Sequence, residues 1–441
     1  MKKINTSPIS GTQELLPSLQ AEFNRLKSGI AEAFHRHGFQ NIETPMIERT
    51  EVLLAKAGGE TEKQIYKVIK TDEVADEADQ ALRFDHTVSL ARYTVEHMND
   101  LAFPFKVSQI GRNFRGERAQ KGRFREFYQC DVDVIGWGKL PLAYDAEVIL
   151  TLGEALKVLP LPADFYFRVS NRRILSGVLE ELNLEHLGAE IFGIVDHAEK
   201  VSQAETVAAL AALGLGSELI ERLLDLIEIR GERREAIQRL QALGFEGETF
   251  RAGVAELDEV LRLLTEVLGA PSGDGVSTTN VIADLKIVRG LDYYTGTVFE
   301  TLVHGYERIG SICSGGRYEN LAGNYTQQRL PGVGGSIGLT RLFYVLQDCG
   351  AVRASEAKAV GVCVLPMGEE LYGAAADAAE RLRAQGQSVD LCLSGKKLGD
   401  QLRYAAKVAD FALIVGENEV ASGVYSLKNL RTGEATGVRL D

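Results

Sequence analysis

Apolar residues follow two spacings along this chain, and the spacings divide its first half into helical and extended segments. In residues 19–38 they recur every three or four positions, which predicts a helix that ends near Gly38. The apolar positions of this helix are Phe23, Leu26, Ile30, Ala33 and Phe34. Alternation with polar residues predicts strands instead. The predicted strands are 40–44, 63–70, 105–110 and 124–135, and the further predicted helices are 88–99 and 142–158.

The pattern changes between residues 171 and 250, which are rich in Ala, Leu and Glu at helical spacing. The predicted helices there are 175–187, 200–213, 217–227 and 233–243. Because strand patterns stand on both sides, we predict a helical insertion between two halves of one sheet domain. Another helix, 251–268, follows; the sheet pattern resumes at Val276 and closes with a helix over 338–347.

The C-terminal part alternates strands and helices after a small, polar link, 348–357. This order is typical of a separate compact α/β domain, and we predict a mostly parallel sheet whose edge strand is 436–440. The predicted fold class is therefore α+β. The predicted parts are 1–170 and 251–347 for the two halves of the sheet domain, 171–250 for the insertion, 348–357 for the linker and 358–441 for the C-terminal domain.

Composition narrows the class of protein. A chain of 441 residues is long enough for two or three domains. Because no apolar run approaches the ~20 residues needed to cross a bilayer, and the first residues lack a signal peptide's apolar core, we expect a cytoplasmic protein without a membrane partner. Five scattered cysteines without a CxxC pair indicate reduced thiols and argue against a structural zinc. With a net charge of −13, nucleic acid must be met by a local basic patch.

Such a patch lies between Gly111 and Glu126. Its cations are Arg112, Arg115, Arg118, Lys121, Arg123 and Arg125. A charge run is usually a solvated surface, but here it joins two predicted strands, and Gly116 and Gly122 let the backbone turn so that the cations converge. Guanidinium groups suit phosphates, and Phe127 offers a face for a base. A nucleoside triphosphate fits both, although the chain has no Gly-x4-Gly-Lys-Ser/Thr phosphate loop.

A second candidate site is the stretch 289–300, followed by the glycine-rich segment 310–318. It sets a guanidinium, a carboxylate and two phenols on extended backbone, where spacing decides which side chains share a face. The residues alone leave two interpretations open. One is a pocket for a small polar molecule, and the other is an ordinary sheet with aromatic cross-strand pairs.

These segments together resemble a known family. Residues 114–118 and 123–127 resemble the second motif of the class II aminoacyl-tRNA synthetases, 331–341 the third, and 44–48 the looser first motif. Residues 289–300 and 310–318 are similar to two peptides of the histidine-specific branch. The chain is thus identified as a member of the histidyl-tRNA synthetase family over essentially its whole length. The resemblance implies a class II antiparallel-sheet catalytic domain with a helical insertion, and a C-terminal α/β anticodon-binding domain.

For ATP, the resemblance implies five residues. Arg115 is expected at the α-phosphate and the substrate carboxylate, Glu117 at the adenine amino group, and Arg123 at the outer phosphates. Phe127 and Arg341 are expected to sandwich the adenine ring, partly through a cation–π contact.

For L-histidine, the resemblance implies that the α-ammonium is held by Asp85, Thr87 and Gln129. The imidazole would be bonded by Asp133 and Tyr294, and the pocket completed by Tyr293 and Tyr318. Arg289 is expected to stabilise charge as the substrate carboxylate attacks the α-phosphate and pyrophosphate leaves, so Arg289 and Arg115 are the expected catalytic residues. Because such a displacement depends on positioning and electrostatics, no covalent nucleophile is expected.

The implied reaction has two steps: ATP and L-histidine give histidyl-adenylate, and the histidyl group then moves to the 3′ end of tRNA(His). Mg²⁺ is the expected ion, and a homodimer is expected through the first motif and its Pro45. The C-terminal domain would read the anticodon. Its candidate phosphate contacts are Lys396, Lys397, Arg403 and Lys407, although each also fits a solvated helix face.

The sequence departs from the family pattern at a few positions. Asp85 and Asp133 stand where many bacterial members carry Glu, which shortens the arm and keeps the charge. Thr340 replaces an acidic residue that precedes the third-motif arginine, which leaves the number of magnesium ions open. Ser314 stands where Ala or Gly is common. Gln120 resembles a position that meets the tRNA acceptor end.

Two other functions fit parts of the pattern. One is a catalytically silent paralogue such as the regulatory subunit of ATP phosphoribosyltransferase, and the other is a synthetase-like sensing module of the kind fused to kinases. This chain keeps Arg289, Tyr293, Tyr294 and a full C-terminal domain, and it carries no kinase signature. These features favour the enzyme.

Overall fold

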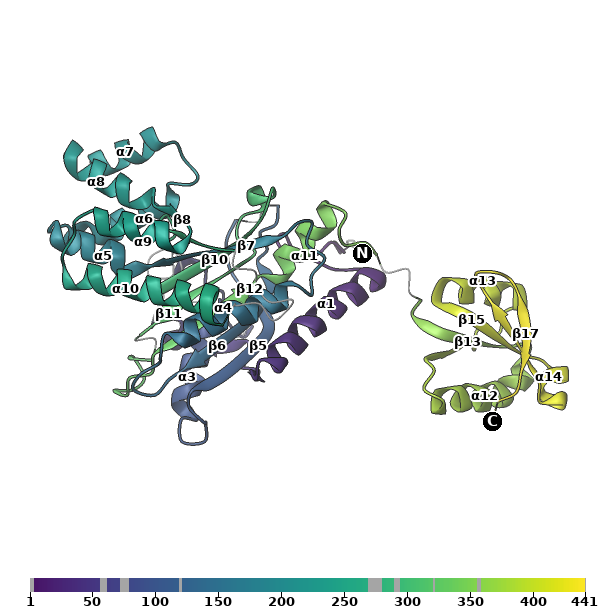
Figure 1. The fold of residues 1–441 in the computed structure, drawn as a ribbon. Coiled ribbons are helices and arrows are strands. Elements are labelled where there is room, and N and C mark those ends of the chain that lie inside the picture. Colours follow the sequence, from purple (N-terminus) through teal and green to yellow (C-terminus); the bar gives the residue numbers. More distant parts are fainter. Residues whose placement is uncertain are drawn as a thin grey trace. The chain divides into compact units, whose positions relative to one another are not determined.

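A computed structural model describes residues 4–55, 62–71, 79–118, 121–268, 280–288, 294–319, 322–354 and 358–440. The chain divides into two compact units (Figure 1). The larger unit includes residues 4–14 and 23–352, and the smaller one includes residues 15–22 and 353–440. Among the residues described, every helix is too short or too polar to pass through a lipid bilayer.

The larger unit is built on a sheet that has nine strands within the described residues, in the order β1-β5-β6-β12-β11-β10-β7-β9-β8. The strands are β1 (Gln40–Asn41), β5 (Phe105–Phe114), β6 (Glu126–Ile135), β7 (Phe165–Asn171), β8 (Arg230–Gly231), β9 (Val281–Asp284), β10 (Thr297–Val303), β11 (Cys313–Tyr318) and β12 (Gly332–Ile337). The run from β5 to β7 is antiparallel throughout, and β1 and β9 join it by parallel pairing. Strands far apart in sequence, such as β6 and β12, therefore lie side by side.

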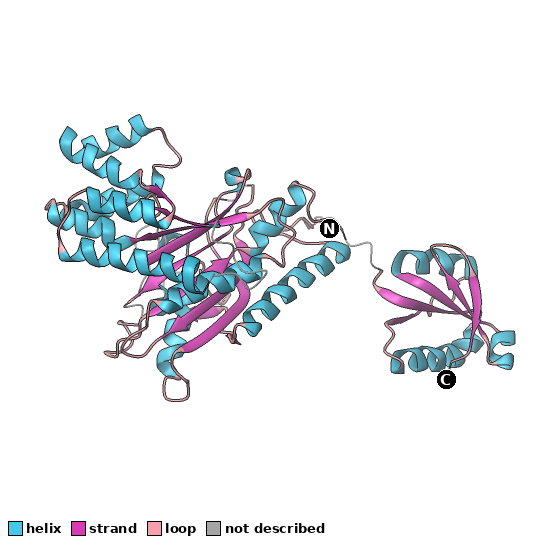
Figure 2. Ribbon diagram, in the orientation of Figure 1, coloured by secondary structure: helices cyan, strands magenta, loops and turns pink. Residues whose placement is uncertain are grey.

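Helices cover this sheet (Figure 2). They are α1 (Pro17–Arg36), α3 (Thr87–Glu96), α4 (Ala143–Leu156), α10 (Glu248–Arg262), which continues as a π-helical turn over Leu263–Val267, and α11 (Leu339–Asp348). The apolar positions that predicted α1 are the ones it buries: Phe23, Leu26, Ile30, Ala33 and Phe34. Because a helix buries one stripe against the sheet, spacing alone identified the buried face.

The predicted insertion is helical except for the short strand β8. Its helices are α5 (Arg172–Glu181), α6 (Gly188–His197), α7 (Gln203–Ala212), α8 (Ser217–Ile227) and α9 (Arg233–Ala242), and they gather near β8, the strand at this edge of the sheet (Figure 1). The sequence pattern missed α6 and extended α5 too far, because Asn183 has a left-handed φ of 58° that ends the helical path. It also missed β8, which pairs with β9, so this segment adds an edge strand to the nine-stranded sheet.

A small three-stranded sheet follows α1 in the described residues, with the order β2-β4-β3. Its strands are β2 (Ile47–Arg49), β3 (Lys67–Val68) and β4 (Gln80–Leu82), and α2 (Thr50–Leu54) follows β2. The strand predicted over 63–70 is reduced to β3, because residues 62–64 form a 3₁₀ turn. The sheet start predicted at Val276 lies outside the described residues.

The smaller unit is an α/β domain with the strand order β14-β13-β15-β16-β17. Its elements are β13 (Val360–Pro366), α12 (Tyr372–Ala384), β14 (Val389–Leu391), α13 (Leu398–Val408), β15 (Ala409–Val415), α14 (Glu417–Ser422), β16 (Tyr425–Asn429) and β17 (Ala435–Val438). The prediction of a mostly parallel sheet was wrong, since β15, β16 and β17 pair antiparallel. Only a short turn joins β16 to β17, and a turn cannot make the crossover that parallel strands need. The prediction that the last strand forms an edge is confirmed.

Candidate functional site

The basic loop is carried by the two longest strands of the sheet, β5 and β6. They pair without interruption from Phe105–Ile135 to Phe114–Glu126. The ladder continues into the loop, where the Arg115 amide donates to the Arg125 carbonyl at 2.9 Å. The loop is also fixed from outside, because the Gly116 amide donates to the Gln64 carbonyl at 2.7 Å. A methyl group at Gly116 would lie 3.1 Å from that carbonyl oxygen, so this tight approach favours glycine.

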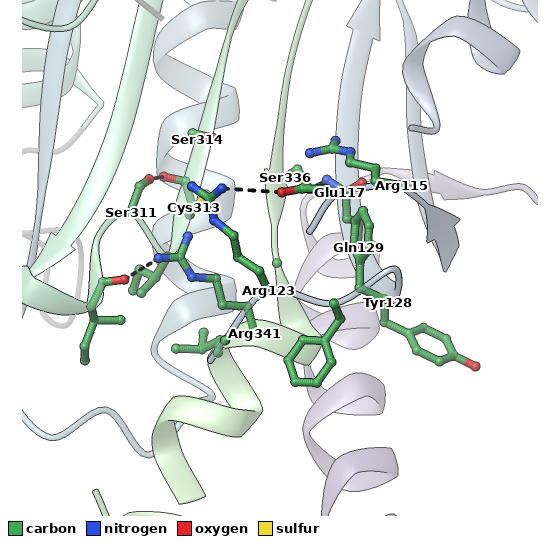
Figure 3. Close-up of a pocket in the computed structure, with 17 residues that line it drawn as sticks. Arg115, Glu117, Arg123, Tyr128, Gln129, Ser311, Cys313, Ser314, Ser336 and Arg341 are labelled. Atoms are coloured by element: carbon green, nitrogen blue, oxygen red, sulfur yellow. Dashed lines mark hydrogen bonds and ion pairs between the residues drawn. The ribbon is translucent and has the colours of Figure 1, made fainter. Parts of the chain in front are cut away.

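The loop, β6, β12 and α11 enclose a cavity of about 310 Å³. Six of the expected site residues line it: Arg115, Glu117, Arg123, Phe127, Gln129 and Arg341. Figure 3 shows the side chains of Glu117, Arg123 and Arg341 in this cavity. Arg123 lies 3.5 Å from the Glu117 carboxylate, and Arg341 donates to the Ile309 carbonyl. The five residues expected at ATP are thus brought together in one cavity.

One contact in this cavity differs from the expected arrangement around adenine. The guanidinium carbon of Arg115 lies 5.2 Å from the centre of the Phe127 ring, a cation–π distance. Its Nε also donates to the Phe84 carbonyl at 3.2 Å. Arg115 therefore lies on the Phe127 ring in this structure, while Arg341 lines the cavity from α11.

A second cavity shares several of these residues and adds acidic ones. It is lined by Asp85, Thr87, Arg115, Arg123, Gln129, Asp131, Asp133, Tyr294, Ser314, Tyr318 and Arg341, among others. Carboxylates and guanidinium groups therefore line one continuous space. Arg289, Tyr293 and Gln120 lie outside the described residues.

Asp133 and Tyr318 are bonded to each other within this cavity. The Tyr318 hydroxyl donates to Asp133 Oδ1 at 2.9 Å, and both residues are buried. Burial raises the pKa of Asp133 to about 8, with a further contribution from the charge of Asp131, so this carboxyl holds its proton near neutral pH. Gly334 stands opposite Asp133 in the β6–β12 pairing, and a methyl group there would lie 2.0 Å from Asp133 Oδ1.

Asp85 is buried just before α3. Its Oδ1 accepts from the Val88 amide at 3.0 Å, which caps the first turn of that helix. Burial raises the pKa of Asp85, while the Val88 amide and the charge of Arg115 partly offset this effect. Its other oxygen, Oδ2, is buried without a hydrogen-bond partner in the described part of the chain.

The structure places two of the departures from the family pattern, Thr340 and Ser314. Thr340 is buried, and its Oγ1 accepts from the Tyr128 amide at 2.7 Å, so it ties α11 to β6. Ser314 stands opposite Ser336 in the β11–β12 pairing, and Ser336 Oγ accepts from Gln129 Nε2 at 2.7 Å. Gln129 is held from the other side by Asn113, which donates to its Oε1 at 2.7 Å.

Asp131 also lines this cavity, and sequence reasoning did not single it out. It lies between Gln129 and Asp133 on β6, and side chains two positions apart in a strand share a face. The spacing 129, 131 and 133 is thus the signal that could have found it. His86 lies beside Asp131, with His86 Nδ1 at 2.9 Å from Asp131 Oδ2.

Comparison with known proteins identifies the family of this chain. A sequence model of the histidyl-tRNA synthetase family matches residues 11–342, and one of the anticodon binding domain matches residues 361–441. A histidine–tRNA ligase of Clostridium tetani is 41% identical over 445 residues, covering 100% of this chain and 98% of that protein. A crystal structure of histidyl-tRNA synthetase from Nostoc sp. PCC 7120 superposes with a TM-score of 0.82 at 38% identity, covering 99% of this chain and 97% of that one.

Proteins with less similar sequences share this fold. A structure from Bacillus halodurans C, described as an ATP phosphoribosyltransferase regulatory subunit/histidyl-tRNA synthetase, has a TM-score of 0.75 at 23% identity and covers 94% of this chain and 100% of that one. The fold is therefore the α+β fold of class II synthetases. By the match of its sequence over nearly its whole length, the chain belongs to the histidyl-tRNA synthetase family.

Proposed function

We propose that this chain is an ATP-dependent histidine–tRNA ligase. It activates L-histidine with ATP to histidyl-adenylate, releases pyrophosphate, and transfers the histidyl group to the 3′ end of tRNA(His). The observation that carries this proposal, beyond the family, is that buried carboxylates and guanidinium groups line one cavity. Carboxylates suit the ammonium of an amino acid and guanidinium groups suit phosphates, so the two reactants can meet there.

ATP takes the side of the cavity next to the basic loop. Arg115 binds the α-phosphate, Arg123 the outer phosphates and Glu117 the adenine amino group. Phe127 and Arg341 hold the ring from two sides, which requires Arg115 to leave the Phe127 face that it covers now. Support comes from the shared cavity and from the exposure of Arg123, whose side chain is 56% exposed and can move without breaking a core contact.

L-Histidine takes the acidic side. Asp85, Thr87 and Gln129 hold the α-ammonium, and Asp133 and Tyr294 bind the imidazole. A protonated Asp133 can donate a hydrogen bond to the unprotonated ring nitrogen, which suits a neutral imidazole. Tyr318 fixes the Asp133 carboxyl, and Tyr293 completes the pocket as its resemblance to the family peptide implies.

Arg289 and Arg115 are proposed to lie beside the α-phosphate while it reacts. A cation beside the α-phosphate favours the transition state, because negative charge builds up there as the histidine carboxylate attacks. The assignment of Arg289 rests on the family peptide 289–300.

Mg²⁺ is proposed to accompany ATP. In the described residues no group of three or more His, Cys, Asp or Glu side chains is arranged as a metal site. Mg²⁺ commonly keeps waters and binds through substrate phosphates with few protein ligands, so this arrangement fits an ion that arrives with the nucleotide. When bound, the ion would neutralise charge on the phosphates.

The C-terminal domain, residues 358–441, is proposed to bind the anticodon. Lys396, Lys397, Arg403 and Lys407 are exposed on and before α13, where they can contact phosphates. Residues 171–250 are proposed as an insertion domain, between catalytic parts 1–170 and 251–347, with 348–357 as the linker. Binding of tRNA(His) that weakens steeply with salt would support the phosphate contacts; a salt-independent affinity would count against them.

The chain is also proposed to form a homodimer in the cytoplasm. Next to Pro45, Met46 and Ile47 are 45% and 48% exposed, and a second copy of the chain would cover these apolar side chains. The five cysteines are free thiols, as is typical of a reducing compartment. Size-exclusion chromatography with light scattering tests the dimer; a mass of one chain would exclude it.

Histidine-dependent exchange of labelled pyrophosphate into ATP is the decisive experiment. We expect exchange with L-histidine and none without it, and Asp85→Asn should raise the KM for histidine strongly. Asp100→Asn, which changes an exposed aspartate in a loop, is the matched control. Absence of exchange in a folded, ATP-binding protein would instead support the silent paralogue or the sensing module.

A further inference from the structure

We propose that Asp131 is a second carboxylate that binds the α-ammonium of the amino-acid substrate, together with Asp85. The inference rests on the proposed function, because it takes the ligand of this cavity to be an amino acid. It adds a specificity residue to those implied by the family resemblance.

Asp131 has one oxygen engaged and one available. Its Oδ2 lies 2.9 Å from His86 Nδ1, and both side chains are almost fully buried, at 5% and 1% exposed. Its Oδ1 is buried without a hydrogen-bond partner among the described residues. Because His86 fixes one oxygen and β6 fixes the backbone, the direction of the other oxygen is set before a ligand arrives.

Asp85, just before α3, also has one carboxylate oxygen that is bonded and one that is not. Its Oδ1 accepts from the Val88 amide, and its Oδ2 is the buried oxygen without a partner in the described chain. Both residues line the same cavity, and the charge of Asp131 acts on Asp85. Two fixed carboxylates, one just before α3 and one on β6, thus each present an oxygen that has no hydrogen-bond partner within the described residues.

Asp133 differs from this pair. Its Oδ1 already accepts the Tyr318 hydroxyl. It is therefore suited to a neutral, hydrogen-bonding part of the ligand.

Asp85 and Asp131 together favour a positively charged ligand group. A buried carboxylate oxygen without a partner costs several kcal/mol, and removal of water by a ligand increases that cost unless the ligand brings positive charge. Within the described residues no lysine or arginine forms an ion pair with either aspartate, and the ring nitrogen of His86 is the partner of Asp131. An ammonium group, with three donors, can bond both free oxygens at once.

L-Histidinol is the probe, because it keeps the ammonium and the imidazole and lacks the carboxylate that would contact the arginines. Asp131→Asn removes the charge at nearly constant volume. We expect its dissociation constant for histidinol, measured by calorimetry, to rise about 10- to 100-fold, the loss of one charge-assisted hydrogen bond. The KM for ATP and the unfolding temperature should stay near those of the wild type.

His86→Gln separates ligand binding from support of the pocket, since it removes the His86 contact and keeps the Asp131 charge. It should lose clearly less affinity for histidinol than Asp131→Asn. An equal loss in both variants, or wild-type affinity in Asp131→Asn, overturns the inference. If Asp131→Asn does not fold, Asp131→Ser takes its place in the same titration with the same criteria.

The wild type separates this inference from the proposed function. If the wild type neither binds histidinol nor catalyses histidine-dependent exchange, the proposed function itself falls. If it does both and the Asp131 variant binds histidinol equally well, only the role of Asp131 is wrong.

Discussion

The Tyr318 hydroxyl donates a hydrogen bond of 2.9 Å to Asp133 Oδ1, and this bond spans the strand that lies between them. Tyr318 belongs to β11 and Asp133 to β6, and the glycine-rich β12 separates the two strands in the sheet. The bond can form because Gly334 leaves open the space above β12. Burial raises the pKa of Asp133 to about 8, so the protonation of this carboxyl changes within the physiological pH range.

Asp133 should make stability fall as pH rises. An unfolded aspartate has a pKa of about 3.9, so between about pH 4 and the folded pKa of about 8 the folded state holds a proton that the unfolded state lacks. Asp133→Asn removes this dependence. We expect the unfolding temperature of the variant minus that of the wild type to increase from pH 5 to pH 8, measured by scanning calorimetry. A difference that is constant with pH would show that Asp133 is ionised throughout.

Gly334→Ala should damage the histidine side of the cavity. The added methyl group would lie 2.0 Å from Asp133 Oδ1, so the Asp133 carboxyl must move away from Tyr318. We expect the KM for histidine in pyrophosphate exchange to rise at least about 10-fold, with a loss of stability of about 1–3 kcal/mol from overpacking. Gly193→Ala on α6 is the control, because no atom lies within 4 Å of its added methyl group. Equal effects of the two changes would contradict the proposed steric cause.

Thr340→Val should destabilise the contact between α11 and β6. Valine has a similar shape but no oxygen, so the Tyr128 amide loses the acceptor that lies 2.7 Å away. An unpaired amide costs about 1–3 kcal/mol. The midpoint of the first urea unfolding transition should fall accordingly, while Thr340→Ser, which keeps the hydroxyl, should stay near the wild type. A serine variant as unstable as the valine variant would point to the lost methyl group instead.

Arg168→Met should be among the most destabilising single changes in the larger unit. Arg168 is 2% exposed, and it bonds Asp284 at 2.9 Å and Glu300 at 2.5 Å, as well as Glu199, which follows α6. Removing one partner leaves buried carboxylates without compensation, at a cost of about 3–5 kcal/mol. Arg173→Met is the matched control, since Arg173 is 36% exposed and its pair with Glu256 is partly solvated. We expect a much smaller shift of the urea midpoint for it, because a partly solvated pair contributes about 1 kcal/mol or less.

Arg289→His tests the assigned role in the transition state. It should slow adenylate formation in single turnovers much more than it weakens ATP binding, because an interaction made only in the transition state changes the rate and not the ground-state affinity. Rapid quench with labelled ATP gives the rate, and calorimetry gives the affinity. Equal losses in rate and affinity would remove this role from Arg289.

Much of the fold could be read from spacing. The apolar stripe of α1 and the bounds of α8, Ser217–Ile227, follow from helical periodicity, because these helices bury one face locally. Non-local pairing was harder to predict. The two residues of β8 carry no pattern of their own and become a strand only because β9 lies beside them. The antiparallel half of the C-terminal sheet likewise depends on how strands meet after the chain turns.

The sequence by itself determined the chemistry of the candidate site: the converging cations of the loop, the acidic and aromatic residues, and the family to which their order belongs. Only the tertiary structure decided the state of each group. Within the described residues, Asp85 and Asp131 each keep one oxygen without a hydrogen-bond partner. Asp133 keeps its proton because it is buried and lies near Asp131, and Tyr318 reaches it from 185 positions away in the chain. Burial and hydrogen bonding set these states, and both depend on residues that only the folded chain brings together.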